Sequence, residues 1–313
     1  MERTKHKDKL RGFHADQMIV DYPYFPTAIL TSDWHLREDK PLCRTDNYWE
    51  VQWNKVDFIS QLQKQYNCLV LHGGDLFDKW KITTYLAKVT AKHLPNKFYT
   101  IYGQHDLPQH NLDLTEKCGI DLLAEVGRLE TMDQCHWGQI PKDISSICCG
   151  LPSQRILVWH KMNYKGEPPW PGCTDPTALR LLKKYSQYDL ILTGDNHKSF
   201  TQEYQGRWLV NPGSLMRMDA DQENHKPRVY LWYAEDNSIV PVFIPIEQDV
   251  ISREHIEQKK QRDGRIDNFV KRLNSDWKAS LTFEENLEIF KKKNKVPQDI
   301  MSIIYEAIEP IKK

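Results

Sequence analysis

The sequence has no excess of either charge, because 43 Lys and Arg residues balance 43 Asp and Glu residues among 313 positions. Zero net charge argues against a protein that holds nucleic acid by bulk positive charge, although it leaves room for a local basic groove. Internal repeats and low-complexity segments are also lacking. With 40% hydrophobic and 27% charged residues, the chain is neither disordered nor collagen-like, and its length suggests two domains or one large α/β domain with an extension.

Long apolar runs, a leader peptide and paired cysteines are lacking as well. No run approaches the roughly 20 apolar residues that a membrane-spanning helix needs, and Met1–Arg11 has no apolar segment of the signal-peptide kind. The seven cysteines are odd in number and none are spaced as C-x-x-C. This indicates free thiols in a reducing compartment rather than disulfides or a zinc knuckle. We therefore expect a cytoplasmic protein that does not bind a membrane.

Short apolar runs are frequent, and each ends abruptly in polar, glycine-containing sequence, as buried strands do. These predicted strands are Ala28–Thr31, Cys68–Leu71, Phe98–Tyr102, Arg155–Trp159 and Leu190–Thr193. Helices are predicted over Trp49–Tyr66 and Thr83–His93 and from Asp175-Pro176 onward, and a β-hairpin is predicted over Arg228–Ala234 and Ile239–Ile244. The alternation of strands and helices predicts a layered α/β core.

The sequence beyond residue 248 is charged and helical in pattern. Thr282 and Glu285 have the spacing of a capping box, and Pro297 opens another amphipathic helix. We expect an N-terminal extension over residues 1–26, a catalytic domain over residues 27–248 and a C-terminal helical region over residues 249–313.

Acidic residues and histidines follow the predicted strands. Loops at the carboxyl ends of the strands of an open α/β sheet converge on one crevice, so these side chains should meet there: Asp33, His35, Asp75, His105, His160, Asp195 and His197. Carboxylates and imidazoles gathered in this way are ligands for divalent transition metals. An Asp shared between two ions makes a two-metal site, which suits in-line attack on phosphorus. Each fragment alone is a weak signal, but five in order at strand ends are not expected by chance.

With these motifs the chain resembles the calcineurin-like metallophosphoesterase family over about residues 27–218. The family pattern D-x-H, G-D-x-x-D, G-N-H-D/E, a lone H and G-H-x-H appears here as Asp33-Trp34-His35, Gly74-Asp75-Leu76-Phe77-Asp78, Gly103-Gln104-His105-Asp106, His160 and Gly194-Asp195-Asn196-His197. The loop Asn211-Pro212-Gly213-Ser214 is common in smaller members. The resemblance implies an α/β fold in which a two-sheet sandwich is flanked by helices, here with a C-terminal helical extension.

The resemblance also implies roles for site residues. The first of two metal ions would be held by Asp33, His35, Asp75 and His197, and the second by Asp75, Gln104, His160 and Asp195. A hydroxide that bridges the two ions would attack phosphorus. His105 would protonate the leaving oxygen as general acid, oriented by Asp78 or Asp106.

Two departures from the family pattern fall on the second metal. Gln104 stands where the family has Asn, and Asp195 stands where it has His. Because a third carboxylate favours oxygen-loving ions, we expect manganese, or else magnesium, in preference to zinc; iron also fits. The alternative is a broken second site in a degenerate relative that serves as an interaction module.

The motifs indicate the substrate class less directly than the metal ligands. The protein-phosphatase branch is disfavoured because Lys79 replaces its phosphate-holding Arg. SbcD-type DNA nucleases and small phosphodiesterases are more similar, with a cyclic-nucleotide or other small-molecule phosphodiesterase as the alternative to a DNA nuclease. Trp34 and Trp80 are candidates for stacking unpaired bases, and Arg217 for meeting a phosphate; the alternatives are core tryptophans and a solvated arginine.

Partners follow from the same resemblance. DNA is the expected substrate. The C-terminal helices either cap the catalytic domain or dock an SbcC-like ATPase partner, and a homodimer is possible.

Overall fold

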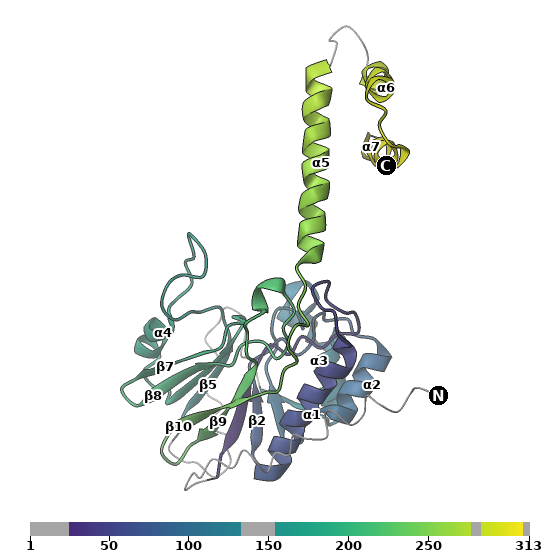
Figure 1. The fold of residues 1–313 in the computed structure, drawn as a ribbon. Coiled ribbons are helices and arrows are strands. Elements are labelled where there is room, and N and C mark those ends of the chain that lie inside the picture. Colours follow the sequence, from purple (N-terminus) through teal and green to yellow (C-terminus); the bar gives the residue numbers. More distant parts are fainter. Residues whose placement is uncertain (1–24, 133–153, 277–282, 309–313) are drawn as a thin grey trace. The chain divides into compact units, whose positions relative to one another are not determined.

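The computed structural model describes residues 25–132, 154–276 and 283–308 (Figure 1). Residues 1–24 of the expected N-terminal extension and the capping residue Thr282 lie outside the described residues. The chain divides into two compact units, of which the first ends at Ser252 and the second begins at Arg253. Each unit is described here by itself.

The first unit contains two mixed sheets. The larger has the order β10-β9-β1-β2-β3-β4, with strands Ser238–Phe243, Arg228–Tyr233, Ala28–Thr31, Leu69–His72, Phe98–Thr100 and Glu130–Thr131. The smaller has the order β5-β6-β8-β7, with strands Ile156–His160, Leu190–Gly194, Arg207–Asn211 and Phe200–Tyr204. Strands β1 to β4 are parallel to one another, as are β5, β6 and β8, whereas β9, β10 and β7 join by antiparallel pairing.

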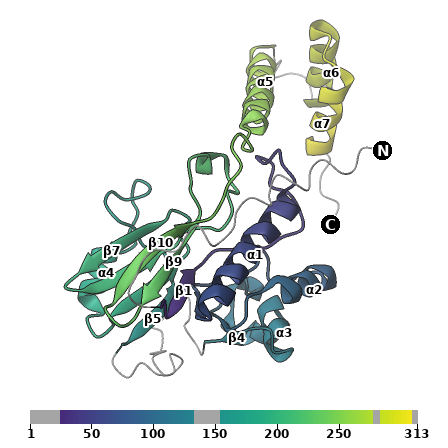
Figure 2. The same ribbon diagram turned by 60° about the horizontal axis from the view of Figure 1, so that its bottom comes forward.

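Alternation along each strand builds the layers, because successive side chains point to opposite faces of a sheet. Leu30 of β1 packs between the sheets with Val158 of β5. Its neighbour Ile29 faces the helices α1 (Tyr48–Tyr66), α2 (Thr84–His93) and α3 (Gly119–Glu125). Leu157 of β5 faces α4 (Ala178–Lys184) on the other side. The result is four layers with α1 to α3 outside one sheet and α4 outside the other (Figure 2), so the predicted two-sheet α/β sandwich is confirmed.

N-cap side chains mark where helices begin. The Asn47 side chain caps α1 by accepting from Glu50 N, and Thr83 caps α2 by accepting from Leu86 N. The predicted start of the third helix at Asp175-Pro176 is wrong: Thr177 is the N-cap, and its hydroxyl accepts from Arg180 N. The sequence does not predict the strands β4, β7 and β8; β4 has only two residues, and β7 has no buried residue.

The second unit consists of α5 (Glu254–Asp276), α6 (Phe283–Asn294) and α7 (Gln298–Ile308). Helix α7 begins directly after Pro297, as expected. Among the described residues, the buried apolar side chains of the second unit are Leu287, Phe290 and Met301. Within the described parts of the chain, every helix is too short or too polar to cross a membrane.

Candidate metal centre

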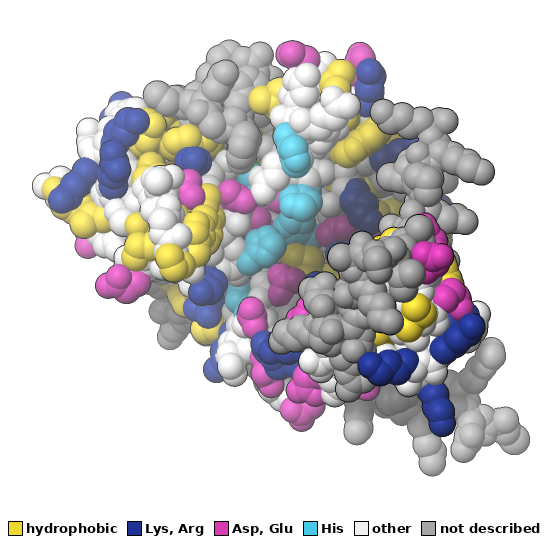
Figure 3. All heavy atoms as spheres, turned by 90° about the horizontal axis from the view of Figure 1, so that it is seen from above, with side chains coloured by type: hydrophobic (Ala, Val, Ile, Leu, Met, Phe, Trp, Pro, Cys, Tyr) yellow, Lys and Arg dark blue, Asp and Glu magenta, His cyan; other side chains and the backbone are white. Residues whose placement is uncertain are grey.

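The predicted site residues follow the carboxyl ends of strands from both sheets. Asp33 and His35 come after β1, Asp75 after β2, and His105 after β3, while the second sheet supplies the end of β5 at His160 and the loop after β6. Strands β1, β2 and β3 are parallel, so their ends meet at one edge. Figure 3 views this side of the molecule and shows histidine side chains gathered next to acidic ones.

Four of these residues hold the backbone in the left-handed region, which non-glycine residues rarely adopt. The φ angles are 50° at Asp33, 45° at His35, 56° at Asp75 and 76° at Asp195. Backbone hydrogen bonds hold the turns, among them Asp33 N to Gly74 O at 3.0 Å and His35 N to Asp75 O at 3.0 Å. Such strain persists where the surroundings fix it and is frequent at functional sites.

The side chains that these turns present form three overlapping groups whose ligand atoms all lie within 4.8 Å of one another. The groups are Asp33 with His35 and His197, His35 with Asp75 and His105, and Asp33 with Asp75 and His160. His35 Nε2 lies 3.1 Å from His197 Nε2 and 3.6 Å from Asp75 Oδ2. The structure therefore brings together five of the seven predicted ligands, and His105 beside them.

His160 shows why this cluster suits a cation. Its Nδ1 lies 2.7 Å from Gly73 O, an acceptor only, so Nδ1 carries the proton. In the neutral ring Nε2 then has a lone pair, which lies 3.2 Å from Asp75 Oδ2. Both atoms are buried without a hydrogen-bond partner, as are Asp33 Oδ2 and Gln104 Oε1. Two lone pairs that face each other are stabilised by a positive charge between them, so the donor set fits divalent metal ions.

The electrostatics show that the same position attracts a positive charge, which a proton on His160 Nε2 supplies when no ion is bound. Burial alone would lower the pKa of His160, but Asp75 and Asp33 raise it to about 10. Burial would raise the pKa of Asp75, but His160 and His35 hold it well below its usual range. Burial lowers the pKa of His35, which keeps that imidazole neutral and able to act as a ligand. The carboxylates thus create a buried site that attracts positive charge.

The two residues that depart from the family pattern contact each other. Gln104 Nε2 donates to Asp195 Oδ1 at 2.7 Å, which leaves Gln104 Oε1 free to face the site. Asp195 N donates to Asp33 Oδ1 at 3.0 Å. Asp195 is outside the three compact groups. The two substitutions therefore form one hydrogen-bonded unit, a relation that the separate motifs do not reveal.

His105 is exposed and close to His35, with ring centroids 4.9 Å apart. Its Nδ1 lies 2.9 Å from the backbone oxygen of Asp78, so Nδ1 donates and Nε2 is free. The Asp78 side chain instead pairs with Arg37. Asp106 is buried and accepts from Gly103 N and from the two backbone N–H groups after Asp75. Of the two residues expected to orient His105, Asp78 contacts it, through its backbone carbonyl, whereas Asp106 binds backbone N–H groups instead.

Two of the substrate-binding predictions are wrong. Trp34 is 0% exposed, donates to Thr31 Oγ1 at 2.7 Å and packs in the core, so no base can reach its ring. Arg217 is 3% exposed and donates to the backbone oxygens of Glu223 and Glu247, so it cannot meet a phosphate.

The other two candidates remain accessible: Lys79 is exposed and Trp80 is half-buried. Of the other tryptophans near the site loops, Trp159 is buried against α4, whereas Trp170 is 48% exposed.

Sequence reasoning missed Arg37. Its Nη1 lies 3.0 Å from Asp78 Oδ1, and its backbone exchanges hydrogen bonds with the Gln52 side chain in both directions. Arg37 therefore fixes the residue that orients His105. Its position four residues after Asp33, within the same loop, was the available signal.

Glycines allow the loops to approach closely. A Cβ at Gly103 would lie 2.1 Å from Asp75 Oδ1, and one at Gly74 would lie 2.6 Å from His160 Nδ1.

A family model described as the calcineurin-like phosphoesterase superfamily domain matches residues 28–231. No curated protein matches the chain. Among solved structures, an archaeal phosphodiesterase is similar at 14% identity and TM-score 0.41, over 69% of this chain and 99% of that chain. Zinc-bound Vps29 from Entamoeba histolytica is similar at 15% identity and TM-score 0.33, over 69% and 97%. Vacuolar protein sorting 29 from Cryptosporidium parvum is similar at 16% identity and TM-score 0.35, over 72% and 100%.

Proposed function

Since the chain belongs to the calcineurin-like phosphoesterase superfamily, we propose that it is a two-metal phosphodiesterase that cleaves DNA. The observation that carries the proposal is the meeting of unpartnered acceptor atoms at the strand ends, above all His160 Nε2 against Asp75 Oδ2. Asp33, His35, Asp75 and His197 would hold one ion. Asp75, Gln104, His160 and Asp195 would hold the other. Manganese is preferred because the two positions together have three carboxylate ligands, Asp33, Asp75 and Asp195.

Bound divalent ions would polarise the phosphoryl oxygens and activate water for in-line attack. His105 would complete the reaction as general acid. Its Nδ1–H is held by the Asp78 carbonyl, so Nε2 is the atom that delivers a proton to the leaving oxygen. The exposure of the ring leaves room for a substrate to approach it.

Three accessible side chains favour a nucleic-acid substrate over a small phosphodiester. Lys79 directly follows Asp78 and is exposed, Trp80 is half-buried, and Trp170 is 48% exposed on the loop after His160. A cation for a phosphate and aromatic rings for unpaired bases are the components of a single-strand binding surface.

Location and partners complete the proposal. Among the described residues, Cys43, Cys68 and Cys118 are buried and form no disulfide, which fits a reducing, cytoplasmic environment. Helices α6 and α7 carry exposed apolar side chains, including Ile289 at 44% and Ile303 at 54%. These are candidates for docking an SbcC-like ATPase or a second copy of the chain.

The proposal is tested by offering the purified protein single-stranded DNA, double-stranded DNA, a cyclic nucleotide and bis-(p-nitrophenyl) phosphate with Mn²⁺. We expect cleavage of DNA, and loss of cleavage in Asp75→Asn but not in Asp113→Asn, an exposed carboxylate of the short 3-10 helix Leu112–Lys117 outside the cluster. Cleavage of the cyclic nucleotide alone would favour the small-molecule alternative. Cleavage of none by a metal-loaded protein would favour an interaction module.

A further inference from the structure

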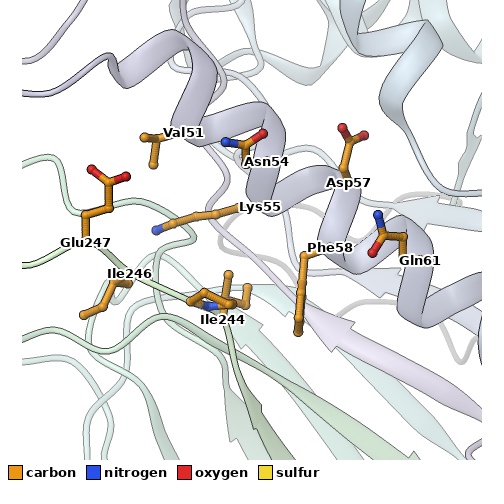
Figure 4. Close-up of a pocket in the computed structure, with 10 residues that line it drawn as sticks. Val51, Asn54, Lys55, Asp57, Phe58, Gln61, Ile244, Ile246 and Glu247 are labelled. Carbon is orange, nitrogen blue, oxygen red and sulfur yellow. The ribbon is translucent and has the colours of Figure 1, made fainter. Parts of the chain in front are cut away.

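A pocket separate from the metal centre lies in the first unit between α1 and the segment that follows β10 (Figure 4). Its volume is about 470 Å³, within the usual range of small-molecule sites. Helix α1 supplies one wall with Val51, Asn54, Lys55, Asp57, Phe58 and Gln61, and the opposite wall is Ile244, Pro245, Ile246 and Glu247. None of these residues belongs to the metal centre, so the pocket needs an explanation of its own.

Lys55 is the unusual member of this lining. Only 3% of the residue is exposed, yet Figure 4 shows its side chain extending from α1 towards Ile246 and Glu247. Its ammonium group donates to Leu215 O at 2.8 Å. Since a protonated amino group has three N–H donors, two remain beyond this bond, and among the described residues Lys55 forms no ion pair with a carboxylate. The amino group of Lys55 therefore has spare hydrogen-bonding capacity, in a pocket whose opposite wall is apolar at Ile244, Pro245 and Ile246.

The surroundings of Lys55 increase the local positive charge. Arg44 and Arg217 are also buried, and both lower the pKa of Lys55 further after burial, the largest cause. The carboxylate that opposes them is Asp46, which Arg44 already engages through two nitrogens. Arg217 Nε is buried without a partner. These groups disfavour the protonated form of Lys55, and a carboxylate in the pocket would stabilise that form.

We propose that the pocket binds a small amphipathic carboxylate, whose charged end meets Lys55 and whose apolar body lies against Val51, Phe58 and Ile246. Lys55 is the one basic residue of the lining, which also includes the acidic residues Asp57 and Glu247. A monoanion is therefore favoured over a dianion such as phosphate. The apolar part of the lining, at Val51, Phe58, Ile244 and Ile246, favours a ligand with a hydrocarbon body.

The geometry also connects the pocket with the metal centre. Leu215 accepts from Lys55 through its carbonyl, and its N–H donates to Asp33 O at 3.1 Å. The neighbouring Ser214 N donates to His197 O at 3.2 Å. A carboxylate that draws the ammonium away from Leu215 therefore loosens the segment behind two candidate ligands. This second part of the inference rests on the proposed metal centre.

The binding test uses the full chain without metal, with octanoate as probe and 1-octanol and acetate as references, by isothermal titration calorimetry. We expect octanoate to bind at least about tenfold more tightly than either reference, because a hydrogen bond to a charged group is worth about a tenfold change or more. Lys55→Met should abolish the preference for octanoate over octanol. Lys64→Met, which removes an exposed lysine of the same helix, should keep it.

Ile246→Glu is a second variant that leaves the bond between Lys55 and Leu215 in place and repels a carboxylate from the opposite wall. Loss of octanoate binding here, with an unchanged unfolding temperature, would support the site. Equal binding by wild type, Lys55→Met and Ile246→Glu would refute it. Absence of octanoate binding, together with self-association that Ile246→Glu abolishes, would assign the pocket to a second copy of the chain instead.

The connection is tested by titrating Mn²⁺ with and without saturating octanoate. We expect octanoate to weaken Mn²⁺ binding by about fivefold, at the lower end of typical coupling, and to have no effect in Lys55→Met. Equal Mn²⁺ affinities would refute the connection while the metal-free binding result stands. Absence of any Mn²⁺ binding would instead contradict the proposed function.

Discussion

The hydrogen bond between Gln104 and Asp195 predicts that these two residues act as one unit at the second metal position. The perturbation is a set of three variants: Gln104→Asn, Asp195→His, and the double variant, which carries the family pattern at both positions. Gln104→Asn shortens the side chain by one methylene and breaks the 2.7 Å bond to Asp195 Oδ1. Asp195→His removes the carboxylate oxygen that accepts this bond, so the Gln104 amide loses its partner.

The expected size follows from the geometry. A hydrogen bond to a charged group contributes about 1.5–3 kcal/mol, and we reduce this to about 1 kcal/mol because both residues are partly exposed. Each single variant should therefore bind its second Mn²⁺ about fivefold more weakly. The double variant should lose less than the sum of the two losses and should prefer Zn²⁺ over Mn²⁺, since an imidazole replaces a carboxylate.

The assay is isothermal titration calorimetry of the four proteins with Mn²⁺ and with Zn²⁺, with bis-(p-nitrophenyl) phosphate hydrolysis as a second readout. Strictly additive losses in the double variant would refute the reasoning, because residues that do not share an interaction show additive effects. A wild-type protein that prefers Zn²⁺ at the second position would refute the inference of a carboxylate-selected manganese site.

Three further predictions concern the fold and the general acid. Trp34→Ala should destabilise the protein by about 3–5 kcal/mol in urea unfolding, because its ring is fully buried. Arg37→Met should lower turnover and shift its pH profile without loss of metal, because Arg37 acts on His105 only through Asp78; loss of metal would contradict this. Burial lowers the pKa of His225 to about 4, so the neutral ring favours the folded state. This contribution to the free energy of unfolding is fully present above about pH 6.5 and falls as the pH drops towards 4, with a loss of about 2 kcal/mol at pH 5. His225→Gln should abolish this part of the pH dependence.

The candidate site was predictable because strand ends and chemistry coincide in the sequence. Each apolar run ends at a turn that carries an acid or a histidine, and parallel pairing of β1, β2 and β3 forces those ends to one edge. The four-layer fold followed from the same alternation, since Ile29 and Leu30 face opposite layers.

The errors arise where the folded structure, rather than the local sequence pattern, decides where a residue lies. Trp34 sits between two site residues in sequence, but its neighbours Asp33 and His35 have positive φ angles, and the resulting turn directs the indole into the core. Arg217 follows a site loop but is held by backbone carbonyls of distant segments. The strand β7 has polar residues and no apolar run, so its place in the sheet depends on pairing with β8 rather than on its own pattern.

The most direct test of the account is the metal content of the chain after equilibrium dialysis against Mn²⁺, measured by inductively coupled plasma mass spectrometry. We predict about two ions per chain, and a drop of about one ion in His160→Gln, because His160 Nε2 faces Asp75 at 3.2 Å as a ligand of one position. His93→Gln, at the end of α2 and away from the cluster, should bind as the wild type does. A wild-type chain that binds no ion, or equal binding by the wild type and His160→Gln, would contradict the two-metal account.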